Sequence, residues 1–127
     1  MDNMIEVKVS EIEGSALDWA VAEAVGTEGY KYLDEWGWYE EEKCYGYEDG
    51  ESRFVGYSPS ADWEQGGPMI EKFEVGILRL QDNWEAGFKE TSIGYGYKGS
   101  TPLLAAMRAI VAAEVGDTVK VPKDLVS

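Results

Sequence analysis

The chain has 127 residues, which suffice for one domain with a modest hydrophobic core. Its apolar content of 44% excludes a disordered acidic tail, and its formal net charge of −14 at pH 7 argues against general binding to nucleic acids. Histidine is absent, so the commonest general base and metal ligand is missing, and the single cysteine, Cys44, excludes an internal disulfide. We therefore expect no enzymatic activity, no cofactor and no bound metal.

Neither the N-terminal residues nor the apolar runs indicate a secreted or membrane protein. The N-terminal residues MDNMIEVKVS lack the basic and apolar parts of a secretory signal. The longest apolar run, within 103–115, is interrupted by Arg108 and is too short to cross a bilayer. We expect a cytoplasmic protein with no membrane partner.

The N-terminal part predicts a strand followed by a helix. Apolar and charged residues alternate over 5–9, which is typical of a short strand. Ser10 and Glu13 fit a capping box, which predicts a turn of helix at this point. A longer helix is expected over 15–25, with its apolar residues on one side and Trp19 on the other. A tryptophan in that position either packs under a neighbouring segment or lines a binding site.

Residues 27–57 differ in composition from the rest of the chain. They contain nine aromatic residues and nine acids against three bases. The dipeptide Asp49-Gly50 favours a tight hairpin turn, and aromatic residues favour the strands on either side of it. We interpret 27–56 as a variable, hairpin-rich insertion with an aromatic face and an acidic face. Such a composition is more typical of a small sheet than of a ligand-binding platform.

The middle of the chain predicts a short helix and two strands. Pro68 suits the first position of a helix over 69–73. Strands are expected over 75–80 and over 88–97, joined by a loop that carries Trp84.

The clearest element of the sequence is a helix over 102–115. Thr101 can cap its start, a proline stands at its first position, and Gly116 can end it. Large apolar residues cover one side and alanines most of the other, with Arg108 at the boundary. So little polar surface predicts burial on both sides, either in the centre of the domain or in a homo-oligomer contact. A strand over 118–121 follows.

These elements predict an α+β fold in which residues 1–127 form one small domain. We expect an antiparallel or mixed sheet packed on two main helices, 15–25 and 102–115, together with the acidic aromatic insertion.

The stretch YSPSADWEQGGPMIEKF, residues 57–73, contains most of the candidate binding residues. Serine hydroxyls and glycine-flanked amides can donate hydrogen bonds, an indole can stack on a planar ring, and a helix start is weakly positive. With one residue from the first helix and two from the last, the predicted ligand-binding set is Trp19, Ser58, Ser60, Asp62, Trp63, Gly66, Gly67, Thr101 and Arg108. The tryptophans would stack, the serines and glycine amides would donate, and Thr101 and Arg108 would meet negative charge. Such a set suits a small nucleotide-like ligand.

An alternative interpretation of this stretch is ordinary turn chemistry. Ser-Pro-Ser and Gly-Gly-Pro are typical of turns, and Asp62 can cap local backbone amides. The GxxxxGK[ST] motif of phosphate-binding loops is absent from the sequence. Paired carboxylates such as Asp18 and Asp62 suggest acid–base chemistry only weakly, because the chain is so rich in acids.

Three blocks of the sequence resemble the NinX-like family of small phage proteins. The blocks are EVKVSEIEGSALDWAVAEAVG, YSPSADWEQGGPMIEK and STPLLAAMRAIVAAEVGDTVKVPKDL. The resemblance implies a phage or prophage gene expressed in the bacterial cytoplasm. It brings no catalytic or binding assignment, and the segment 27–56 lies outside the three blocks.

Two hypotheses of function remain. The first is a non-enzymatic phage accessory protein that binds a small nucleotide-like ligand and thereby sequesters a host immune signal, by analogy with other small counter-defence proteins. The alternative is an acidic protein-interaction module, or an inhibitor that mimics DNA, which docks on a basic host protein through 27–57.

Overall fold

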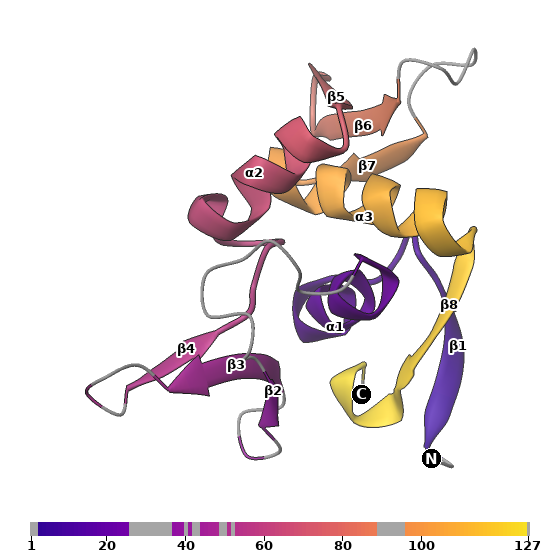
Figure 1. Cartoon of the computed structure of the whole chain (residues 1–127). Coiled ribbons are helices and arrows are strands. Elements are labelled where there is room, and N and C mark those ends of the chain that lie inside the picture. The colour runs from indigo at the N-terminus through magenta and orange to yellow at the C-terminus, as the bar shows by residue number, and fades with distance from the viewer. Residues whose placement is uncertain are drawn as a thin grey trace.

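The computed structural model describes residues 3–25, 37–39, 41, 44–48, 51, 53–88 and 96–126, and within these it contains three α-helices and three antiparallel sheets (Figure 1). The α+β class predicted from the sequence is confirmed. The helices are α1 (Gly14–Val25), α2 (Trp63–Lys72) and α3 (Pro102–Val115). The strands are β1 (Met4–Lys8), β2 (Gly37–Tyr39), β3 (Cys44–Glu48), β4 (Phe54–Gly56), β5 (Val75–Arg79), β6 (Trp84–Phe88), β7 (Tyr97–Gly99) and β8 (Thr118–Pro122), and a short 3-10 helix, Lys123–Leu125, follows β8.

Helix α3 lies at the centre of the fold, as its composition predicts. Every residue from Leu103 to Val111 is buried. The sheet β5–β6–β7 covers one side of the helix and α1 packs on the other (Figure 1). The chain itself therefore covers both sides, and the alanine-rich side does not need a second subunit to be buried.

Local signals set both ends of α3 where the sequence predicts them. The Thr101 hydroxyl accepts a hydrogen bond from the backbone N–H of Leu104 at 3.1 Å. Gly116 ends the helix with a φ of 97°, a conformation that favours glycine, and its N–H donates to the carbonyl of Ala112. The chain then forms β8, which pairs with β1 in an antiparallel ribbon beside α1.

Close contact between β7 and α3 depends on Gly99. A Cβ atom at this position would stand 2.6 Å from the backbone nitrogen of Ala105 and 2.9 Å from the Leu104 side chain. Only a residue without a side chain fits there. The close approach holds β7 and the residues around it against the first turns of α3.

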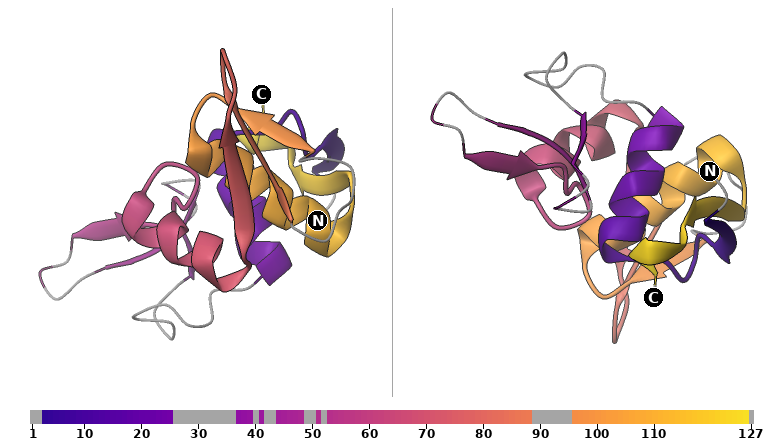
Figure 2. Two further views of the ribbon diagram at one scale, coloured as in Figure 1. Left: turned by 90° about the horizontal axis from the view of Figure 1, so that it is seen from above. Right: turned by 90° about the horizontal axis from the view of Figure 1, so that it is seen from below.

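The sheet β2–β3–β4 projects from the rest of the fold, and it is made from the predicted insertion (Figure 2). The backbone N–H of Tyr57 donates to the carbonyl of Tyr45 at 2.7 Å, and the Tyr45 hydroxyl donates to Glu23 of α1. Tyr45 thus connects this sheet to the helical part. The predicted Asp49-Gly50 turn lies outside the described residues.

Helix α2 is longer than the sequence predicts, because it begins at Trp63 and not at 69. Its cap is Asp62, whose carboxylate accepts the backbone N–H of Glu64 at 2.9 Å. The Gly-Gly-Pro sequence, typical of a turn, is therefore inside the helix, with Pro68 in its second half. Tertiary packing outweighs the local preference here, since Gly66 lies directly on the loop that precedes the helix.

The strands before α3 also differ from the prediction. Trp84 begins β6 and is not in a loop, because a tight turn in which Leu80 N–H donates to the Asn83 carbonyl joins β5 to β6. Of the strand expected over 88–97, the structure describes only the two ends, Phe88 in β6 and the start of β7; Thr91, Ile93 and Tyr95 lie outside the described residues.

The packing of α2 gives a stability test with a matched control. A Cβ atom on Gly66 would stand 2.3 Å from the carbonyl oxygen of Pro59, which is backbone and cannot rotate away, whereas on Gly67 its nearest neighbour would be Trp63 at 3.5 Å. We expect Gly66→Ala to lower the free energy of unfolding by roughly 1–3 kcal/mol. Gly67→Ala should leave it unchanged or raise it by up to about 1 kcal/mol, because alanine is the better helix former.

Urea unfolding of the two variants beside the parent protein measures both effects. Equal stability of the two variants would contradict the close packing of α2 on the Pro59 carbonyl.

Candidate functional site

The serines of the loop before α2 are held by hydrogen bonds within the fold. Ser60 is 9% exposed, and its backbone N–H donates to the Asp18 carboxylate of α1 at 2.9 Å. The backbone N–H of Ser58 donates to the side-chain oxygen of Gln65 at 2.7 Å. These bonds fasten the loop to both α1 and α2.

Asp62 and the two glycines belong to the first turns of α2. Gly66 donates its N–H to the carbonyl of Asp62 at 2.8 Å, and Gly67 follows it inside the helix. Amides within a helix point along its axis to the preceding turn and are not presented to a ligand. Asp62, Gly66 and Gly67 therefore have structural roles in α2, and their positions do not need a ligand to explain them.

The two candidate tryptophans have different surroundings. Trp19 is half-buried and packs against the hydrophobic core. Trp63 is 56% exposed, and its ring lies along α2 beside Gly67. An exposed indole can stack on a planar ring, so the stacking role of Trp63 stays a prediction, while the setting of Trp19 matches the structural alternative considered for it.

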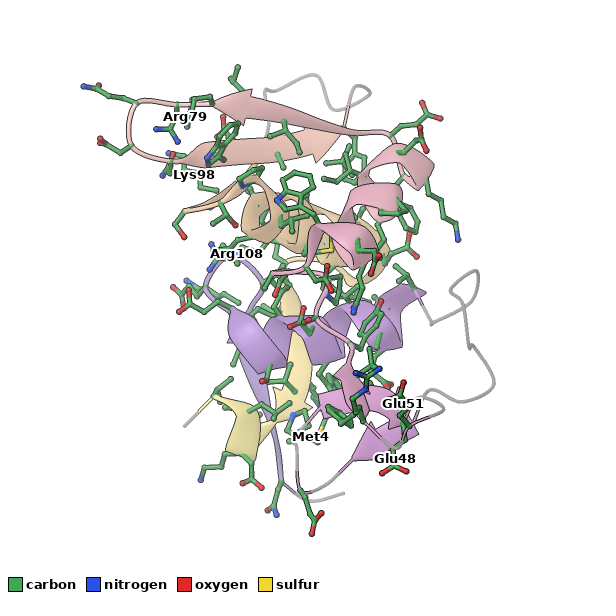
Figure 3. All side chains as sticks on the ribbon, turned by 90° about the vertical axis from the view of Figure 1, so that its left-hand side faces the viewer. Met4, Glu48, Glu51, Arg79, Lys98 and Arg108 are labelled. Atoms are coloured by element: carbon green, nitrogen blue, oxygen red, sulfur yellow. The ribbon has the colours of Figure 1, made fainter. Side chains whose placement is uncertain are left out.

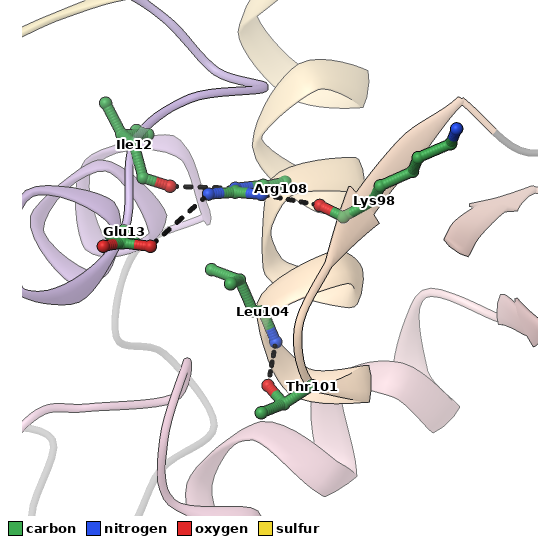
Figure 4. Close-up of polar contacts among 6 residues, drawn as sticks. All are labelled: Ile12, Glu13, Lys98, Thr101, Leu104 and Arg108. Atoms are coloured by element: carbon green, nitrogen blue, oxygen red, sulfur yellow. Dashed lines mark hydrogen bonds and ion pairs between the residues drawn. The ribbon is translucent and has the colours of Figure 1, made fainter. Parts of the chain in front are cut away.

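Arg108 has the most unusual setting of the candidate residues. It is 9% exposed in the middle of α3. Its Nε donates to the Ile12 carbonyl at 2.9 Å and its Nη1 to the Lys98 carbonyl at 2.6 Å (Figure 4). Its Nη2 is 3.9 Å from Glu13 Oε1, which is an ion pair but longer than a hydrogen bond.

The charge of Arg108 is only loosely compensated by the described residues. Burial lowers the pKa of its guanidinium from the ordinary value, and the negative charge of Glu13 raises it. The carbonyls of Ile12 and Lys98 are dipoles without net charge, and the Glu13 side chain is 74% exposed. The Lys98 side chain extends away from the guanidinium (Figure 4).

Arg108 also lines an open cavity of about 450 Å³, where three separate parts of the chain meet. Its other lining residues are Ser10, Asp82, Asn83, Gly96, Lys98, Gly99 and Ser100. They come from the segment after β1, the turn between β5 and β6, and the chain from the residue before β7 to the start of α3. The volume lies within the range of small-molecule pockets, about 300–1,000 Å³.

Of the predicted ligand-binding residues, one lines this cavity and one is next to it, while the others lie elsewhere. Arg108 lines it, and Thr101 directly follows the lining residue Ser100, although the Thr101 hydroxyl caps α3. The other seven predicted residues are in α1, the loop after β4 and α2, and none of them lines this cavity.

Most of the lining residues were not predicted from the sequence. Asp82 and Asn83 are typical of a turn, and Ser10 fitted a capping box. Their local patterns therefore indicated a turn and a helix cap, and not a binding site. The residues around Ser10 form a turn, and α1 begins only at Gly14. The one usable signal was an arginine in the middle of a long apolar stretch of the helix.

The chemistry of the cavity favours a polar ligand that carries negative charge. Arg108 offers a guanidinium, Ser10 and Ser100 offer hydroxyls, and Asn83 can both donate and accept. Asp82 is the acidic residue of the lining and disfavours an anion close to it. Within the described ranges no group of three or more Cys, Asp or Glu could hold a metal ion, and no helix is long and apolar enough to span a membrane.

The buried Asp18 gives a prediction on pH and stability. Burial raises its pKa from 3.8 to about 6, although hydrogen bonds from the Ser60 amide and hydroxyl lower it. Because the folded pKa is above the unfolded one, the bound proton stabilises the folded protein. This contribution is fully present below pH 3.8 and is lost as the pH rises through about 6.

We expect Asp18→Asn to become more stable than the parent protein as the pH rises. An asparagine keeps the size of the side chain and can hydrogen-bond to Ser60 without a charge. The difference in the free energy of unfolding should grow by on the order of 2 kcal/mol between about pH 4 and about pH 7.5, measured with urea. Glu11→Gln, at an exposed position, controls for the change in net charge. A difference that stays constant with pH would contradict the titration of Asp18 in the fold.

The family described as Bacteriophage P22, NinX is matched by residues 8–114 of this chain. The matched range contains the three α-helices almost completely and all the residues that line the cavity. It also includes the segment 27–56. No curated protein matches the sequence.

Proposed function

The chain belongs to the NinX family of phage proteins, and on this premise we propose that it is a non-enzymatic accessory protein that binds a small nucleotide-like ligand. The observation that supports the proposal is the cavity beside α3, which is lined by Arg108, a buried residue whose charge is only loosely compensated. Burying such a charge lowers the stability of a folded protein. A role in ligand binding would explain why the arginine is there despite this cost.

The groups around the cavity suit the parts of a nucleotide. A phosphate would lie at Arg108, because a guanidinium can donate two parallel hydrogen bonds to its oxygens. Hydroxyls of Ser10 and Ser100 and the amide of Asn83 would meet the sugar or the polar edge of a base. In an infected cell, binding without turnover would withdraw a nucleotide signal from the host, which is the sequestration role.

Blocking the cavity tests where the ligand binds. Gly96 lines the cavity, and a Cβ atom there would meet no atom within 4 Å, so Gly96→Phe should fill the cavity without disturbing the fold. Ala61→Phe adds the same ring at an exposed position in the loop between Ser60 and Asp62, where the other candidate residues are. Cyclic dinucleotides, ADP-ribose and mononucleotides can be screened against the parent protein by calorimetry, and the best ligand can then be titrated into both variants.

We expect Gly96→Phe to weaken binding at least about tenfold and Ala61→Phe to change it less than about twofold, since only the first ring occupies the ligand volume. The reverse pattern would place the ligand at the loop and overturn the cavity as its site. The absence of measurable heat with every nucleotide tested, together with no nucleotide copurifying with the protein, would overturn the proposed function.

One observation favours the alternative, an acidic protein-interaction module. Glu48 at the end of β3 and Glu51 in the turn that follows are exposed, and both lie well away from Lys98 and Arg108 (Figure 3). An acidic surface so placed could meet a basic host protein while the cavity stays free.

Deletion of residues 30–54 separates the two functions. Under the alternative, the deletion abolishes association with the basic host protein, and raising the salt concentration weakens that association in the parent protein, because exposed charges are screened beyond about 8 Å at physiological ionic strength. Nucleotide binding, measured by calorimetry, should survive the deletion. Host-protein association that is insensitive to both changes would exclude this sheet as the interaction surface.

A further inference from the structure

The hydrogen bonds of Arg108 leave part of its guanidinium available. A guanidinium has five N–H groups, and two of these are used by the carbonyls of Ile12 and Lys98. Among the described residues, the other three N–H groups, one on Nη1 and both on Nη2, have no hydrogen-bond acceptor. The two carbonyls belong to separate segments, one just before α1 and one in β7, and together they fix the position of the guanidinium.

Glu13 is close to Nη2 of this guanidinium but does not accept a hydrogen bond from it. Its Oε1 stands 3.9 Å from Nη2, and its side chain is 74% exposed. An ion pair of this length is weak when its carboxylate is exposed to solvent, and another anion can easily break it. In contrast, Arg108 is held on two sides and cannot follow Glu13 into solvent.

From this arrangement we propose that the ligand presents an oxyanion, a phosphate or a carboxylate, which displaces Glu13 from Nη2 of Arg108. The inference rests on the proposed function and specifies which group of the ligand is recognised. An oxyanion of the ligand can come within hydrogen-bonding distance of the Arg108 N–H groups, whereas the Glu13 carboxylate remains 3.9 Å from Nη2. The hydroxyls of Ser10 and Ser100 line the same cavity and can donate to its other oxygens.

Removal of the competing carboxylate should therefore strengthen binding. We expect Glu13→Gln to raise the affinity for inorganic phosphate, or for acetate, by about three- to fivefold, which is the effect of one weak ion pair. Glu11→Gln removes the same charge from the same segment, and its exposed side chain is the matched control for the overall field of the protein. It should change the affinity by less than about one and a half times.

The binding can be followed at Arg108 itself by titrating phosphate and acetate separately into protein with ¹⁵N-labelled arginine. The Nε–H signal of Arg108 should shift with one or both anions, and the anion that binds more tightly tells whether the ligand group is a phosphate or a carboxylate. Chloride at the same ionic strength should leave the signal unchanged. Because Glu13→Gln keeps the Arg108 contacts with backbone, the test does not depend on a variant that could fail to fold.

Equal affinities in Glu13→Gln and Glu11→Gln, or an Arg108 signal that does not respond to either anion, would overturn this inference. Both results are compatible with nucleotide binding through other groups of the cavity, so they leave the proposed function standing. Conversely, phosphate binding that depends on Glu13 in a protein that binds none of the nucleotides would support the oxyanion site and count against the nucleotide-like ligand.

Discussion

A positive charge in the middle of the central helix is the constraint on which the rest of this fold depends. Because α3 is covered on both sides, the guanidinium of Arg108 must find hydrogen-bond acceptors within the protein. It uses the carbonyls of Ile12, just before α1, and of Lys98, in β7. One side chain therefore connects the two layers that enclose the helix. The cavity lies where these two layers and α3 meet, so the residue that joins the layers also supplies the cavity with its charge.

Elements whose signals are local could be predicted from the sequence, and elements that depend on distant contacts could not. The helix 102–115 has its cap, its apolar sides and its terminal glycine within its own residues, and its bounds match the structure. Helix α2 starts earlier than expected because Gly66 packs on the carbonyl of Pro59, a contact that allows only glycine and that no local pattern indicates. Likewise, the turn that places Trp84 in β6 needs the pairing of β5 with β6.

In the candidate site, too, features with local signals could be predicted and features that depend on distant contacts could not. The Asp62 carboxylate has a local role as the cap of α2, which the sequence could suggest, whereas Ser60 has a partner far away along the chain. Ser60 is bound by Asp18 across 42 positions, and only the folded structure brings them together. Arg108 was identified because a charge among apolar helical residues is a local anomaly. The residues that surround it come from turns, where serine, asparagine and glycine are common for structural reasons alone, so a sequence cannot separate the two uses.

The net charge and the cavity act over different distances, and together they define which anions could bind. A formal charge of −14 repels any negative ligand at long range, and a nucleic-acid polymer meets this repulsion at each of its phosphates. A small anion meets it once, and salt screens most of it beyond about 8 Å at physiological ionic strength. Within the cavity, short hydrogen bonds to a fixed guanidinium act at close range and are hardly screened. The acidic surface and the proposed site at Arg108 are therefore compatible. The net charge disfavours polyanions, as the sequence predicts, whereas the proposed site would accept a small ligand with a single oxyanion group.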